Sequence, residues 1–89
     1  MATVSFTSAL QRFLPAPSAQ VEGGTVGTAL AAVFASHPVL RGYVLDDQGA
    51  LRRHVAIYVN GEPVRYRLRL TDPVASRDEI YVFQALSGG

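Results

Sequence analysis

The residues with the clearest chemical potential are the last two of the sequence, Gly88 and Gly89. At average glycine usage of about 7%, a terminal Gly-Gly pair arises by chance in roughly 0.5% of chains. The pair follows a predicted strand at Ile80–Phe83 after a short link, so we expect the terminal carboxylate to project from the fold. Because neither glycine has a Cβ, an extended tail can enter a channel too narrow for side chains. A partner enzyme can activate a carboxylate presented in this way, for example as an acyl-adenylate.

The composition removes most other reactive groups. The chain has no cysteine, which excludes disulfides, thiolate nucleophiles and cysteine-built metal sites. All 8 basic residues are arginine, so no lysine is present for a Schiff base or for internal isopeptide attachment. The two histidines are too few for a histidine-rich metal site. We assign a catalytic role neither to His37, before a proline, nor to His54, at the start of a predicted strand.

Three arginines alternate with other residues in the segment Val64–Leu70, which we predict to be a strand returning from a hairpin turn at Asn60-Gly61. A strand there would place Arg65, Arg67 and Arg69 on one side. The simpler interpretation is a solvated face that discourages edge-to-edge association. The alternative is a docking patch for an acidic partner surface.

Periodicity predicts the elements that position these groups. Alternation of polar and apolar residues predicts further strands at Thr3–Thr7, Gln20–Glu22, His54–Val59 and Ile80–Phe83. Apolar residues at spacings of three and four predict one main helix, Val26–Ser36, with Thr25 as its cap and Pro38 beyond its end. After that helix we expect an irregular connection with a short helical turn at Leu40–Leu45.

This order of elements favours an α+β fold of the ubiquitin-like β-grasp type. We expect a mixed sheet of four to five strands with one main helix across one face, and the first and last strands as parallel neighbours. The length of 89 residues and the apolar fraction of 48% fit one domain, residues 1–85, followed by a flexible tail, residues 86–89.

Neither a membrane nor a nucleic acid is an expected partner. The longest apolar run, Ala29–Ala35, is too short to span a bilayer, and residues 1–20 lack the features of a signal peptide. The net charge of +1 gives no strong attraction toward nucleic acid. We therefore expect a cytoplasmic protein.

The stretch Arg53–Gly89 resembles the small ubiquitin-like sulfur-carrier proteins of the ThiS/MoaD type, including the cysteine-biosynthesis carriers of actinobacterial type. The matching segments are Tyr58-Val59-Asn60-Gly61-Glu62, Arg77-Asp78-Glu79, Ile80–Phe83 and Gly88-Gly89. The helix Val26–Ser36 fits the same pattern less specifically. The chain departs from the family at Gln84-Ala85, where many members carry proline.

The resemblance implies a protein co-substrate rather than an enzyme. An ATP-dependent activating enzyme would adenylate Gly89, which would then become a thiocarboxylate and pass its sulfur to a biosynthetic acceptor enzyme. Gly88 would enter the channel of the partner, and Phe83 and Leu86 would be the apolar docking residues beside the tail. We also include Ser87, Arg65 and Arg67 among the partner-binding residues. The chain itself would bind no cofactor and no metal, since the partner uses the ATP.

Two other functions stay open. The chain would serve as the small subunit of a molybdopterin synthase if its thiocarboxylate acts inside a larger catalytic subunit. It would be a non-conjugating ubiquitin-like interaction module if its tail is inert.

Overall fold

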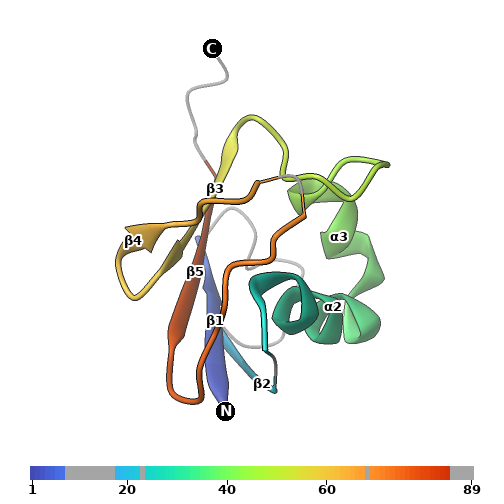
Figure 1. Ribbon diagram of the computed structural model, residues 1–89. Coiled ribbons are helices and arrows are strands. Elements are labelled where there is room, and N and C mark those ends of the chain that lie inside the picture. Colours follow the sequence, from blue (N-terminus) through green and yellow to red (C-terminus); the bar gives the residue numbers. More distant parts are fainter. Residues whose placement is uncertain (8–17, 23, 68, 85–89) are drawn as a thin grey trace.

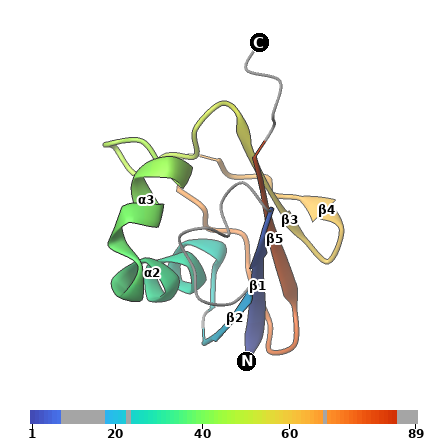
Figure 2. The same ribbon diagram turned by 180° about the vertical axis from the view of Figure 1, so that it is seen from behind.

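The computed structural model describes residues 1–7, 18–22, 24–67 and 69–84. In these residues a mixed sheet of five strands has the order β2-β1-β5-β3-β4, and both helices lie on one side of it (Figure 1, Figure 2). The elements are β1 (Ala2–Phe6), β2 (Ser18–Val21), α2 (Val26–Ser36), α3 (Pro38–Val44), β3 (Val55–Val59), β4 (Glu62–Pro63) and β5 (Glu79–Gln84). The α+β prediction and the β-grasp arrangement are confirmed.

The last strand, β5, occupies the centre of the sheet. It runs parallel to β1, with Val4 opposite Ile80, and antiparallel to β3, with Ile57 opposite Val82. These four apolar side chains are almost completely buried beneath the helices. The predicted parallel pairing of the first and last strands is therefore confirmed.

Helix α2 begins and ends where the sequence predicts. The Thr25 hydroxyl accepts the Thr28 N–H at 3.1 Å, and the Thr28 hydroxyl accepts the Thr25 N–H at 3.0 Å, which forms a capping box. Its predicted apolar side is buried against the sheet. At the far end, the His37 N–H donates to the Val33 oxygen at 3.0 Å before Pro38 starts a new helix.

The second helix, α3, is longer than the helical turn predicted at Leu40–Leu45. It covers Pro38–Val44 and buries Leu40 and Val44. Proline suits this first turn because its missing N–H would have no partner inside the helix. The connection after α2 is therefore more regular than we expected.

The strand predicted at Val64–Leu70 is wrong, and with it the one-sided row of Arg65, Arg67 and Arg69. Strand β4 has only two residues, and the last backbone bond to β3 is donated by the Val64 N–H to the Ile57 oxygen at 2.9 Å, after which the chain turns away from the sheet. The Asp72 carboxylate explains the change, because it accepts the N–H of Arg65 at 2.9 Å and that of Tyr66 at 3.0 Å. A side chain thus takes the donors that a strand would have used.

The connection to β5 is bound to the start of α2. The Gly27 N–H donates to the Leu70 oxygen at 2.8 Å, and the Val26 N–H donates to the Asp72 oxygen at 3.0 Å. These are helix N-terminal donors without partners inside the helix. A Cβ on Gly27 would lie only 3.2 Å from the Leu70 oxygen, so glycine permits this close approach.

Neither helix in the described parts of the chain is long and apolar enough to cross a membrane.

We predict that Asp72→Ala lowers the free energy of unfolding by about 1–2 kcal/mol, because two backbone donors lose a charged acceptor. Denaturant unfolding monitored by circular dichroism measures the change. Asp47→Ala, which removes an exposed turn carboxylate, is the matched control and should stay within about 0.5 kcal/mol of the parent. Equal stability of the Asp72 variant and the parent would contradict this role.

Candidate functional site

The sheet face opposite the helices is not covered by any described element (Figure 2). Because side chains alternate along a strand, β5 buries Ile80 and Val82 and turns Tyr81 and Phe83 outward. Tyr81 is 41% exposed and Phe83 is 43% exposed. We call this surface, formed by Ala56, Tyr58, Glu79, Tyr81 and Phe83, the open face.

Strand pairing arranges the open face in rows. Tyr58 of β3 lies directly opposite Tyr81 of β5, and Ala56 lies opposite Phe83. The ring centroids of Tyr81 and Phe83 are 6.4 Å apart with the planes tilted by 45°. Three aromatic rings therefore share one side of two neighbouring strands, which is a composition typical of protein interfaces.

A rigid turn limits the open face at the start of β5. Asn60 and Gly61 both have positive φ, 51° and 85°, as the predicted hairpin turn requires. The Asn60 side chain donates to the Asp78 carboxylate at 3.0 Å and accepts the Glu79 N–H at 2.9 Å. This donation and a second one from the Ala75 N–H hold the pKa of Asp78 below its ordinary value of 3.8.

The opposite end of β5 leads toward the predicted tail. Gln84, the last described residue of β5, lies opposite Val55, and Phe83 is exposed beside it. Phe83 is thus exposed on the strand that precedes the tail, and its role as an apolar docking residue stays a prediction. The other tail residues of the prediction, Leu86, Ser87, Gly88 and Gly89, lie outside the described residues.

The two arginines of the prediction have different environments. The Arg67 guanidinium donates to the backbone oxygens of Arg52 at 2.8 Å and Val55 at 2.9 Å, so it covers the outer edge of β3. Arg65 is exposed, and its side chain has no partner among the described residues. The binding role predicted for both arginines stays a prediction.

Sequence reasoning missed Tyr58, Glu79 and Tyr81 as members of the site. The alternation in Tyr81-Val82-Phe83 showed that Tyr81 faces outward. It carried no information about the residue that lies opposite on another strand. That pairing depends on the register between β3 and β5.

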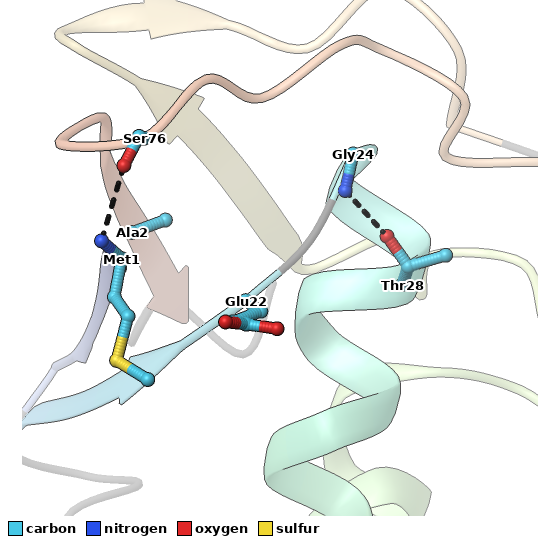
Figure 3. Close-up of a pocket in the computed structure, with 6 residues that line it drawn as sticks. All are labelled: Met1, Ala2, Glu22, Gly24, Thr28 and Ser76. Atoms are coloured by element: carbon cyan, nitrogen blue, oxygen red, sulfur yellow. Dashed lines mark hydrogen bonds between the residues drawn. The ribbon is translucent and has the colours of Figure 1, made fainter.

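A hollow of the described surface lies away from Phe83, where β1 and β5 begin. It encloses about 570 Å³ between the start of β1 and the start of α2 (Figure 3). Two of its polar pairs already satisfy each other: the Met1 amine donates to the Ser76 hydroxyl at 3.2 Å, and the Gly24 N–H donates to the Thr28 hydroxyl at 3.1 Å. Within the described ranges, no group of three or more metal-ligating side chains is arranged to hold an ion.

Comparisons with known proteins agree with this geometry. The model of the ThiS family matches residues 10–89. Small archaeal modifier protein 1 of Haloferax volcanii is 38% identical over 65 residues, which cover 73% of this chain and 70% of that protein. The sulfur carrier protein CysO of Mycobacterium tuberculosis is 31% identical over 74 residues, which cover 81% of this chain and 80% of that protein. A chain in the crystal structure of the Amycolatopsis orientalis BexX/CysO complex has a TM-score of 0.88 and 27% identity, with 100% of both chains covered.

We predict that Asp78 contributes to the acid sensitivity of the fold. Since its folded-state pKa is lowered, its stabilising effect is fully present above the unfolded-state value and is lost as the pH falls through the folded-state pKa. The free energy of unfolding should therefore decline less steeply below about pH 4 in Asp78→Asn than in the parent. Urea unfolding at a series of pH values gives both profiles. Parallel profiles for the variant and the parent would refute the prediction, and Asp47→Asn serves as the single-charge control.

Proposed function

This chain belongs to the ThiS family, and from that membership we propose that it is a sulfur carrier whose C-terminal Gly89 receives the sulfur as a thiocarboxylate. The observation that carries the proposal is that the family match includes Gly88-Gly89 and that these residues follow the central strand of the sheet. The relative named as a sulfur carrier supports the same role. The chain then acts as a co-substrate, and the chemistry belongs to its partner enzymes.

The proposed reaction has two steps. A carboxylate oxygen of Gly89 attacks the α-phosphorus of ATP on an activating enzyme, which gives an acyl-adenylate and releases pyrophosphate. A hydrosulfide or persulfide sulfur then attacks the acyl carbon, AMP leaves, and the thiocarboxylate remains on Gly89. With hydrosulfide one proton is released, and with a persulfide a reductant must also cleave the S–S bond. The thiocarboxylate sulfur is the nucleophile that a sulfur-accepting enzyme uses.

The open face suits the docking that these steps require. Phe83 ends the row of exposed aromatic rings at the end of β5 from which the tail continues. The five residues after Gln84 span at most about 18 Å when extended. A partner that binds the open face can therefore reach the end of the tail without unfolding the domain. Because glycine has no side chain, positions 88 and 89 allow the tail to enter a narrow channel of the partner.

A second candidate is protein modification, which the name of the archaeal relative favours. In that reaction an amine of a target protein attacks the acyl-adenylate, an amide bond forms and AMP leaves. The chain has no lysine, so no internal side-chain amine can capture its own activated glycine. Sulfide and a lysine-containing target compete for the same intermediate, and the two products differ in mass.

We predict that incubation with an activating enzyme, ATP and a sulfide source adds the mass difference of one oxygen replaced by sulfur, localised to Gly89. Gly89→Val should abolish this gain because a side chain obstructs the narrow channel. Gly42→Ala is the control, since a Cβ at Gly42 meets no atom within 4 Å. Intact-mass spectrometry followed by peptide mapping reads the outcome.

Three results would separate the alternatives. A thiocarboxylated Gly89→Val variant would show that the terminal-glycine mechanism is wrong. Stable co-purification with a large catalytic subunit would favour a molybdopterin synthase subunit. Full cellular function after deletion of Gly88 and Gly89 would establish an interaction module with an inert tail.

We further predict that Phe83→Ala raises the KM of the activating enzyme for this chain about tenfold, because truncation of an exposed aromatic anchor weakens docking. The kcat should be unchanged once the enzyme is saturated. Val39→Ala on α3 is the matched control, since Val39 is 63% exposed on the helix side. A KM equal to that of the parent would exclude Phe83 from the docking surface.

A further inference from the structure

A second hollow lies on the open face, at the end away from the tail. It encloses about 560 Å³ and is lined by Tyr58, Asn60, Gly61, Glu79 and Tyr81. We call it the tyrosine pocket. It is separate from the hollow in Figure 3, with which it shares no lining residue.

Two tyrosines form the aromatic part of the tyrosine pocket. Tyr58 and Tyr81 lie directly opposite each other on β3 and β5, so both rings stand on the same side of the sheet. Tyr81 is 41% exposed although its β5 neighbours Ile80 and Val82 are buried. Such exposed tyrosine faces are electron-rich surfaces that attract cations.

The charge of the pocket is negative. Glu79 precedes Tyr81 by two residues on β5 and therefore projects to the same face. Its carboxylate has no hydrogen-bond or ion-pair partner among the described residues; only its backbone groups are bonded, to Asn60. Among the described residues, no arginine lines the pocket. The carboxylate of Asp78 is not part of the lining, because it accepts the Asn60 side chain and the Ala75 N–H.

The pocket is also preorganised. The Asn60 amide uses its nitrogen on Asp78 and its oxygen on the Glu79 N–H, which fixes the turn relative to β5. The positive φ angles of Asn60 and Gly61 close the turn without a side chain at Gly61. The Glu79 carboxylate therefore lies on a fixed backbone. Little conformational entropy of the chain is lost when a ligand binds there.

We propose that the tyrosine pocket binds an arginine side chain of the protein that docks on the open face. A guanidinium is planar, so it can stack on a tyrosine ring while its N–H groups donate to the Glu79 carboxylate. An ammonium group offers a point charge and no such plane. The docking partner is the activating enzyme, and this part of the inference rests on the proposed function.

The proposal is first tested without any partner enzyme. The full chain is titrated by NMR with the peptide acetyl-Gly-Arg-Gly-amide and with its citrulline analogue, which has the same shape and no charge. We expect chemical-shift changes centred on Tyr58, Gly61 and Tyr81 with the arginine peptide, and affinity about two- to fivefold lower with the citrulline peptide. Equal affinity of the two peptides, or shifts centred elsewhere, would overturn the proposal.

Variants separate recognition from structural damage. Glu79→Gln and Tyr81→Leu should each weaken the arginine peptide about two- to fivefold, whereas Tyr81→Phe, which keeps the ring, should bind like the parent. Asp47→Asn, a carboxylate lost from the exposed turn that follows α3, is the matched control. Circular dichroism confirms that each variant is folded. Parent-like binding by a folded Glu79→Gln variant would disprove the role of the carboxylate.

The activation assay then links the pocket to the partner. Glu79→Gln should raise the KM for the chain about two- to fivefold and leave kcat unchanged, because the pocket lies at the opposite end of β5 from the tail. If the arginine peptide binds as expected but Glu79→Gln leaves the KM unchanged, the arginine does not come from the activating enzyme. That assignment would then be wrong. If the parent chain is never thiocarboxylated, the proposed function fails while the titration still decides what the pocket binds.

Discussion

Hydrogen bonding on both sides of β5 is the constraint on which the rest of the structure depends. Its parallel ladder with β1 and its antiparallel ladder with β3 fix one register, since a change on one side would break the bonds on the other. A shift by one residue would bury Tyr81 and Phe83 and expose Ile80 and Val82. The register thus creates the core and the open face together, and it places Gln84, the last described residue of β5, opposite Val55.

The segment before β5 keeps the open face uncovered. Its chain turns to the helix side, where the carbonyls of Leu70 and Asp72 accept the first N–H groups of α2. The Asp72 carboxylate faces back and binds the N–H groups of Arg65 and Tyr66. Asp72 therefore both accepts one of the N–H groups at the helix terminus and stops the strand that would have extended the sheet. This connection therefore does not cover the aromatic side chains of the open face, Tyr58, Tyr81 and Phe83.

The sequence predicts an element well where the decisive signals are local. The boundaries of Val26–Ser36 follow from the Thr25 cap and from Pro38, and the outward direction of Phe83 follows from alternation within β5. The prediction failed at Val64–Leu70 because the alternation there does not reflect strand pairing. That segment is shaped by Asp72 and by the helix terminus, neither of which a local pattern reveals. The tyrosine pocket depends on a register between distant strands, so only the folded chain shows it.

The central position of β5 has a mechanical consequence. If the chain is held at the start of β1 and pulled beyond Gln84, the force acts along β5 and loads its parallel ladder with β1 in shear, so the bonds of that ladder bear the force together. An edge strand peeled from a sheet would instead lose its bonds one after another. A pull on the tail against the start of β1 therefore has to break the β1–β5 bonds together before the central strand can leave the sheet.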